Sequence, residues 1–383
     1  MEERMLETKA IHVGQKPEAL TGAVVVPIYQ TSTFEQEGIG KPRHYAYSRA
    51  GNPTRSALEE VLASLEEGNY ALAFASGMAA TAAVFHSLLR KNDHVIVGDS
   101  IYGGTYRLLE RVFRPWGLEV TYVPVDDVAS YHKALNARTR LIWVETPTNP
   151  LLKVVDLHAL ARLVEKSSCL LAVDNTFATP YFQRPLTLGA HLVVHSTTKY
   201  IGGHSDLIGG AVVTREKDLY ERLKNYQCDT GAVPSPFDCW LTLRGIKTLG
   251  VRMREHEKNA LYLAEYLKTH PKIEKVYYPG LPEHQNHDIA RRQMDGFGGM
   301  VSIELRGSID DVERFVKNLK IFTLAESLGG VESLISVPAL MTHSFFTAEE
   351  RQRRGINENL VRLSVGIEHQ EDLKKDLAQA LNL

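Results

Sequence analysis

Lys199 is the residue of this sequence best suited to act as a nucleophilic amine. It follows an apolar run in the segment VVHSTTKYIGG, so we expect it just past the carboxyl end of a buried strand. Ligands of open α/β sheets bind at that edge. A lysine partly removed from water there loses its preference for the ammonium form and can condense with an aldehyde. The alternative is a solvated surface lysine, because most lysines are exposed.

Asp174 ends another apolar run, in LLAVDNTFATP. A carboxylate buried at this position needs a cationic partner. The protonated pyridine nitrogen of pyridoxal 5'-phosphate (PLP) is such a partner, and keeping it protonated makes the ring an electron sink for a carbanion. The alternative is an aspartate that caps a helix or forms a turn.

Three further segments could hold a phosphate and a ring. In FASGMAATAAVF the amides of Gly77 and Met78 would lie at a helix N-terminus, which is a common phosphate cradle. Tyr102, in DSIYGGTYR, could stack on a ring and pass protons, although a loop tyrosine is more often a packing residue. Asn149, in VETPTNPLLK, could donate to a ring hydroxyl or a substrate carboxylate, with an Asx-turn as the alternative.

Arg362 has its own face of an otherwise apolar strand. In LVRLSVGIE the period of two places Val361, Leu363 and Val365 on one face and Arg362 with Ser364 on the other. The planar guanidinium can bind the α-carboxylate of an amino acid through two parallel hydrogen bonds. A solvated sheet face is the alternative.

Competing motifs are incomplete. GFGGM lacks the third glycine of GxGxxG, no GxxxxGK[ST] occurs, and Leu207 replaces the final glycine of GxSxG in GHSDL. His284 and His287 have helical spacing but no third ligand nearby, so no metal site is expected.

The elements that must position these residues form an α/β pattern. Seven apolar runs predict buried strands, and helix-period segments such as TAAVFHSLLRK and DLHALARLVEKS separate most of them. This alternation predicts a mostly parallel seven-stranded sheet with helices on both faces. The runs are residues 71–74, 94–97, 120–123, 141–144, 170–173, 191–194 and 211–213.

Three parts of the chain are expected. Residues 1–50 lack this rhythm and predict an extended arm that contacts a neighbouring subunit. Residues 51–248 form the large ligand-binding domain. Residues 249–383, with a long helix over 250–270 and strands near 273–280, 299–305 and 360–368, form a smaller α+β domain.

Composition favours a small-molecule ligand. Lys plus Arg total 44 and Asp plus Glu total 46, which gives no electrostatic argument for a nucleic acid or membrane partner. No run approaches the length needed to span a bilayer, and the start has no apolar signal region. Three cysteines without CxxC spacing suit a reducing compartment, so a cytoplasmic location is expected.

Taken together, eight ordered segments resemble the PLP-dependent trans-sulfuration enzymes of Cys/Met metabolism, over about residues 8–380. That family includes cystathionine γ-lyases, γ-synthases and β-lyases and methionine γ-lyases. The segments are YSRAGNPTR, SGMAAT, YGGTYR, ETPTNP, VDNTF, HSTTKYIGGHSD, AESLGGVESL and RLSVGIE.

The resemblance implies the PLP transferase fold of type I and a role for each matching residue. Lys199 would carry PLP as an imine, Asp174 would pair with the pyridine nitrogen, and Tyr102 would stack on the ring. Tyr47 and Arg49 would reach the phosphate of a neighbouring subunit, which implies a homotetramer of two dimers that share active sites. Phosphate ligands would be Gly77, Met78, Ser196 and Thr198, and substrate-binding residues would be Arg362, Asn149, Ser327, Glu326 and Arg107.

The activity implied first is α,γ-elimination of L-cystathionine to L-cysteine, 2-oxobutanoate and ammonia. Gly104 stands where methionine γ-lyases usually carry Cys, and Glu326 matches γ-lyases and γ-synthases. Ala46 replaces an acid found in many members, which would broaden the enzyme toward homocysteine or cysteine. The alternatives are γ-replacement on an activated homoserine, desulfhydration, and a PLP-binding regulator without turnover.

Overall fold

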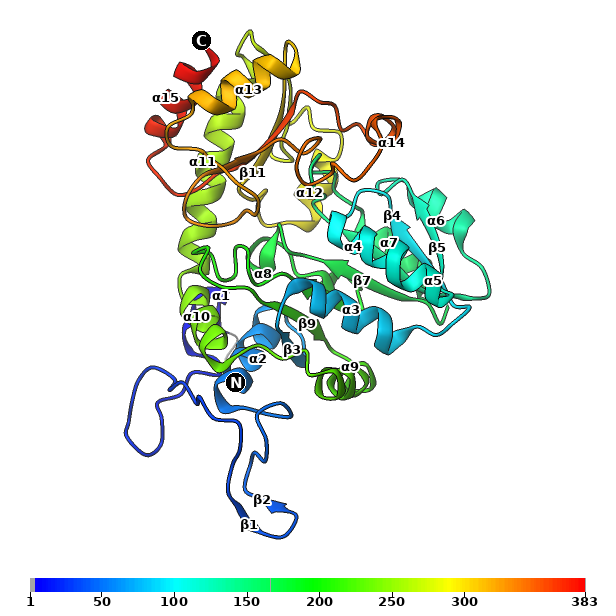
Figure 1. The fold of residues 1–383 in the computed structure, drawn as a ribbon, viewed down its shortest axis with the longest axis vertical. Coiled ribbons are helices and arrows are strands. Elements are labelled where there is room, and N and C mark those ends of the chain that lie inside the picture. The colour runs from blue at the N-terminus through cyan, green and yellow to red at the C-terminus, as the bar shows by residue number, and fades with distance from the viewer. Residues whose placement is uncertain (1–3, 166, 383) are drawn as a thin grey trace.

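The fold consists of two sheets with their helices and an N-terminal arm (Figure 1). A computed structural model describes residues 4–165 and 167–382. No helix in these two ranges has the length and apolar character that crossing a membrane requires.

The larger sheet has the seven predicted strands. The β9 strand is antiparallel to both of its neighbours, and the remaining pairs are parallel, so the predicted mostly parallel sheet is confirmed. In spatial order the strands are β3 (Tyr70–Phe74), β9 (Gly210–Thr214), β8 (Leu192–His195), β7 (Leu170–Asp174), β6 (Thr139–Glu145), β4 (His94–Gly98) and β5 (Glu119–Val123).

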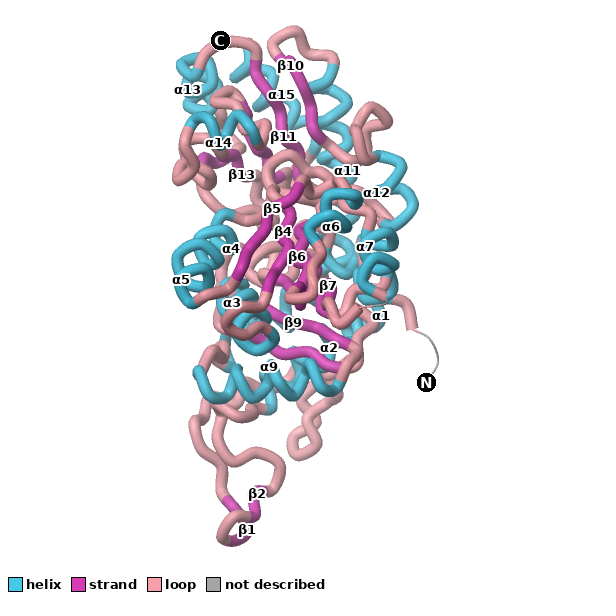
Figure 2. Tube along the Cα trace, turned by 90° about the vertical axis from the view of Figure 1, so that its right-hand side faces the viewer, coloured by secondary structure: helices cyan, strands magenta, loops and turns pink. Residues whose placement is uncertain are grey.

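Helices cover both faces of this sheet, which is why its central strands are apolar throughout (Figure 2). One face packs against α3 (Gly77–Leu88), the π-helical segment Leu109–Phe113 between α4 (Gly103–Leu108) and α5 (Arg114–Trp116), and α9 (Lys217–Thr230). The other packs against α2 (Pro53–Leu65), α6 (Val128–Ala134), α7 (Leu157–Val164) and α10 (Pro236–Ile246). The short α8 (Thr179–Phe182) and the 3-10 turn Pro185–Leu188 follow β7.

The C-terminal part forms a second layered unit. Its sheet is antiparallel except for the last pair, and α11 (Leu249–Lys268), α13 (Ile309–Asn318) and α15 (Gln370–Leu381) bury its core. In order the strands are β10 (Ile273–Tyr277), β11 (Met300–Leu305), β14 (Leu360–Ser364), β13 (Leu334–Ser336) and β12 (Thr323–Leu324). The helices α12 (His287–Gln293) and α14 (Ala348–Arg353) complete this part.

The N-terminal segment is only partly an arm. The prediction of irregular structure over residues 1–50 is wrong for α1 (Leu6–His12). Ala10 of this helix is buried in the hydrophobic core that α2 forms with one face of the large sheet. A seven-residue helix is too short to show a clear apolar period, so tertiary packing decides it. The chain then extends away from the body to the small hairpin of β1 (Gln36–Gly38) and β2 (Lys41–Pro42) (Figure 1).

The start of α11 joins the two sheet units. Leu249 and Met253 pack with Tyr200 from the large unit, whereas Ala260 and Leu263 belong to the core of the small unit. The domain boundary near residue 249 stays a prediction. It falls at the start of α11, a continuous helix that packs against both units.

Arg252 ties α11 to the loop that carries Lys199. Its side chain is buried, and it donates from Nη1 to the Tyr200 carbonyl at 2.6 Å and from Nη2 to the Gly245 carbonyl at 2.8 Å. Burial lowers the pKa of Arg252 to about 10. The loop after β8 is thus held by a buried cation bonded to carbonyl groups.

Replacing Arg252 with Met should destabilise the protein by about 2 kcal/mol, because the buried Tyr200 carbonyl loses its donor, whereas the Gly245 carbonyl keeps its bonds from Thr248. The urea midpoint of unfolding measures this loss. The control is Arg254→Met on the same helix, where an exposed arginine pairs with Glu7 at 2.8 Å. An exposed pair contributes at most about 1 kcal/mol, so equal losses in the two variants would contradict this account.

Candidate active site

The candidate site lies where β6, β7 and β8 end and the small unit meets them. Asp174 is the last residue of β7, and Lys199 follows β8. Hydrogen bonds from the small unit reach this edge, since Lys199 contacts Ser327 and Asn149 contacts Arg362. The second unit therefore borders the sheet edge that the sequence predicts to bind a ligand.

Lys199 is not a solvated surface lysine. Its side chain is half-buried, and Nζ donates to Ser327 Oγ at 2.6 Å. The pKa of Lys199 falls to about 8, mainly because burial penalises the ammonium form, with a further contribution from the Arg362 charge; Glu326 opposes the shift. Roughly a tenth of the amine is therefore neutral at pH 7, far more than for an ordinary lysine, as a nucleophilic amine requires.

Arg362 and Asn149 form a buried pair. Arg362 is 2% exposed, so the alternative of a solvated sheet face is wrong. Its Nη1 donates to Asn149 Oδ1 at 2.9 Å and its Nη2 to the Ser327 carbonyl at 2.8 Å. Within the described ranges no carboxylate lies within ion-pair distance of the guanidinium, and Nε has no hydrogen-bond partner. A buried cation without an anion fits a ligand that carries a carboxylate.

Ser327 connects the amine to the guanidinium through both its side chain and its carbonyl. Its backbone has φ of 84°, which is costly for a residue with a side chain. Two hydrogen bonds hold Ser327 in this conformation, one to its hydroxyl from Lys199 and one to its carbonyl from Arg362.

Asp174 has a partly free carboxylate. Oδ1 accepts from the Thr176 amide at 3.1 Å and from Thr176 Oγ1 at 2.6 Å, so the turn alternative is also realised. Burial raises the pKa of Asp174, whereas the Thr176 bonds and the charge of His195 lower it. Among the described residues Oδ2 accepts no hydrogen bond, which leaves it for a cationic ligand.

The start of α3 offers a cradle for an anion. Ser76 caps the helix by accepting from the Ala79 amide at 3.0 Å, and in the described chain the amides of Gly77 and Met78 donate to no other group. A Cβ at position 77 would lie 2.8 Å from Ser196 Cβ, so only glycine allows this close approach. Thr198 Oγ1 is already bonded to Gly209.

Tyr102 precedes α4 and is 45% exposed. A Cβ at Gly104 would collide with the Tyr102 ring, so a larger residue there would displace Tyr102. Because position 104 is glycine, the Tyr102 ring can occupy this space, where it could stack on a ligand.

The outer wall of the site is positively charged. Arg107 lies over the Phe345 ring with its Cζ 5.0 Å from the centroid. Burial, followed by the charges of Arg362, Arg354 and Arg107, lowers the pKa of His343 to about 3. Glu326 is exposed nearby and is the acid that raises the Lys199 pKa.

Tyr47 and Arg49 are not brought to Lys199 within one chain. Arg49 donates to the Cys228 carbonyl at the end of α9, and its guanidinium lies 5.6 Å from the Tyr47 ring centroid. Both side chains are exposed on the segment between the arm hairpin and α2.

Sequence reasoning overlooked Glu145 and Thr176. Glu145 is 5% exposed at the end of β6, beside Asp174 on β7. The signal was present, because LIWVE ends in an acid after an apolar strand just as LLAVD does.

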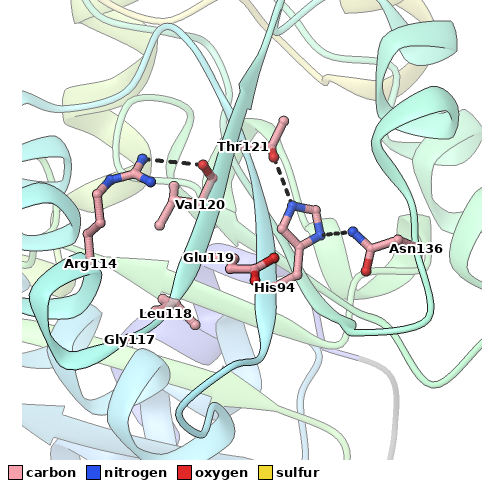
Figure 3. A pocket seen from close by; sticks show the side chains of 8 residues that line it. All are labelled: His94, Arg114, Gly117, Leu118, Glu119, Val120, Thr121 and Asn136. Carbon is pink, nitrogen blue, oxygen red and sulfur yellow. Dashed lines mark hydrogen bonds between the residues drawn. The ribbon is translucent and has the colours of Figure 1, made fainter.

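A separate hollow of about 500 Å³ lies at the opposite edge of the sheet, at the amino ends of β4 and β5 (Figure 3). The His94 ring is bonded there to Thr139 and Thr121 hydroxyls at 2.8 and 2.9 Å, and burial lowers its pKa. These bonds make His94 a structural residue. In the described residues no group of three His, Cys, Asp or Glu could hold a metal ion.

Known proteins resemble this chain over nearly its full length. A cystathionine gamma-synthase of Mycobacterium leprae is 53% identical over 98% of this chain and 97% of its own. A cystathionine gamma-lyase of Dictyostelium discoideum is 52% identical over 98% of this chain and 97% of its own. The solved structure of metB from Corynebacterium glutamicum has a TM-score of 0.97 and 48% identity, covering 99% of this chain and 98% of that one.

The family model described as Cys/Met metabolism PLP-dependent enzyme matches residues 7–382. This match confirms the resemblance, the fold of type I and the cofactor. The chain belongs to the PLP-dependent enzymes of Cys/Met metabolism, the family of cystathionine synthases and lyases.

Proposed function

We propose that the chain is a cystathionine γ-lyase, which splits L-cystathionine and water into L-cysteine, 2-oxobutanoate and ammonia. The bonded series from Lys199 through Ser327 to Arg362 and Asn149 is the observation that carries the Cα chemistry of this proposal. It places an amine of lowered pKa beside a buried guanidinium, as a reaction at the Cα of an amino acid requires.

The residues present fit PLP. The free amides of Gly77 and Met78 and the Ser196 hydroxyl would hold the phosphate, with Thr198 beside them. Asp174 would bind the pyridine nitrogen through its free oxygen, and Lys199 would hold the aldehyde carbon. When bound, PLP supplies an electron sink for the negative charge that develops at Cα.

Each side chain then has a defined task. Arg362 binds the α-carboxylate with Asn149, whose Oδ1 accepts from Arg362 and whose Nδ2 hydrogens remain available. Lys199 Nζ, freed by the substrate amine, removes the Cα proton and next moves a proton at Cβ. Tyr102 protonates the departing sulfur, and the exposed position of its ring favours this task.

Recognition of the distal amino acid end would rest on charge. Glu326 would face the distal ammonium, and Arg107 would contribute to binding the substrate on the positive wall. Ala46 removes an acid from the arm, so homocysteine and cysteine are secondary substrates in this proposal.

The arm supports an assembly in which subunits share sites. Leu20 is 90% exposed and Val24 75%, which suits a surface buried by a second copy. Tyr47 and Arg49 would then serve the phosphate of that copy, in a homotetramer. The cytoplasmic location expected from the thiols stays a prediction.

The second candidate is γ-replacement, in which a thiol is added at Cγ of an activated homoserine. It is favoured by the 53% identity to a protein named cystathionine gamma-synthase. Both reactions use the same Cα chemistry and share cystathionine as substrate or product.

A substrate panel separates the two. We expect cystathionine alone to release 2-oxobutanoate, measured as a 2-oxoacid. Turnover only with O-acetyl- or O-succinylhomoserine plus cysteine would assign γ-replacement and reject the lyase. A visible cofactor band that no amino acid changes would instead indicate a binding protein without turnover.

The Lys199 amine should show its lowered pKa directly. In cofactor-free protein the rate of covalent PLP attachment should rise with pH through about 8, where the amine becomes neutral. An ordinary lysine would give a midpoint of about 10.4. The growth of the visible band measures the rate.

Two variants should move this midpoint in opposite directions. Arg362→Ala removes a positive charge that lowers the Lys199 pKa, so the midpoint rises; Glu326→Gln removes a negative charge that raises it, so the midpoint falls. Shifts of the same sign, or none, would show that these charges do not act on the amine.

A further inference from the structure

Glu145 is a buried carboxyl that none of the proposed catalytic steps uses. It ends β6 and is 5% exposed. Its two oxygens accept from two separate loops, Oε2 from the Tyr102 amide at 2.7 Å and Oε1 from the Asn149 amide at 3.0 Å. One side chain therefore fixes two backbone positions that carry site residues.

The two loops need such a support. Tyr102 is the N-cap residue of α4, its side chain makes no capping hydrogen bond, and it is 45% exposed. Besides Glu145, its backbone is held by the Tyr106 amide, which donates to the Tyr102 carbonyl at 3.1 Å. Asn149 lies in the turn after β6 and accepts from Arg362 at 2.9 Å. A series of bonds thus runs from the Glu145 carboxyl through the Asn149 backbone and amide to the guanidinium of Arg362.

The position is electrostatically costly. Glu145 is the register neighbour of Asp174 on β7, and no cation lies within ion-pair distance of it among the described residues. Burial, then the Asp174 charge, raises the pKa of Glu145 well above its usual range; the bonds from the Tyr102 and Asn149 amides, and then the Arg362 charge, oppose the shift. A strongly perturbed carboxyl at the ligand-binding edge is a candidate for a functional role.

A purely structural role is the alternative, and the chain contains an example of one. Asp376 on α15 is 4% exposed and accepts from the amides of Lys320, Ile321 and Phe322 at 2.8 to 3.1 Å. It belongs to the small unit, whose core α15 helps to form, and among the described residues its hydrogen bonds come from Lys320, Ile321, Phe322 and Gln379, none of which is a candidate site residue. Asp376 is therefore a matched control.

We propose that Glu145 is a positioning residue that fixes Tyr102 and the Asn149–Arg362 pair relative to each other around the reacting carbon. The proposal rests on the roles proposed for Tyr102 and Arg362. It does not depend on the choice between elimination and replacement, because both use these residues.

The test compares Glu145→Gln with Asp376→Asn in the holoenzyme. Glutamine keeps the size of the side chain but has one acceptor oxygen, so one of the two amides loses its partner. We expect kcat to fall about tenfold to a hundredfold, since small displacements of reacting groups cost this much. The dissociation constant for an unreactive amino acid should rise about tenfold, and the visible circular dichroism of the bound cofactor should change.

Asp376→Asn should lower the unfolding midpoint and leave these three properties as in the wild type. If Glu145→Gln behaves in the same way, with a lower midpoint and wild-type kcat, affinity and dichroism, Glu145 is structural and the proposal is overturned.

A second variant covers a loss of folding or cofactor in Glu145→Gln. Glu145→Asp keeps both acceptor oxygens on a shorter chain and should restore part of kcat, the dichroism or cofactor content. A Glu145→Asp protein no better than Glu145→Gln in all of these would also refute the proposal. If the wild type turns over only the homoserine ester with cysteine, the lyase assignment fails, and the Glu145 comparison proceeds with that substrate.

Discussion

The hydrogen bond from Lys199 Nζ to Ser327 Oγ, 2.6 Å long, is the interaction on which the site depends. It joins the loop after β8 to the segment between β12 and β13, and so joins the two sheet units at the amine. Arg252 donates a hydrogen bond to the Tyr200 carbonyl in the same loop, and Arg362 donates one to the Ser327 carbonyl. The position of the amine is thus determined by both units together.

Burial and the neighbouring charges set the protonation of the groups that would react in this site. Burial and Arg362 lower the Lys199 pKa to about 8, while Asp174 and Glu145 have raised pKa values in the same buried edge. A dianionic phosphate, a pyridinium and an α-carboxylate would complement the helix start at Gly77, Asp174 and Arg362 respectively. The site is therefore complementary to a cofactor and substrate with alternating charges.

The large sheet could be predicted because its strands contain apolar runs, most of which are buried on both faces, whereas the edge strand β5 is only partly buried. The pairing of β12 with β13 could not, since strands of two and three residues depend on tertiary contacts, and the packing of Ala10 in α1 has the same origin. For the site, Lys199, Asp174 and Arg362 followed from strand ends and strand periodicity. Glu145 was missed because burial of an acid is invisible until its neighbours are known, and the roles of Tyr47 and Arg49 depend on a second chain.

If Lys199 carries the cofactor as an imine, chemical reduction should fix the cofactor to that lysine. The holoenzyme is reduced with borohydride, digested, and analysed by mass spectrometry for the lysine that bears the reduced cofactor. We expect the label on the peptide that contains Lys199, and no label in Lys199→Ala. A label on another lysine of the wild type, or one that persists in Lys199→Ala, would contradict the assignment to Lys199.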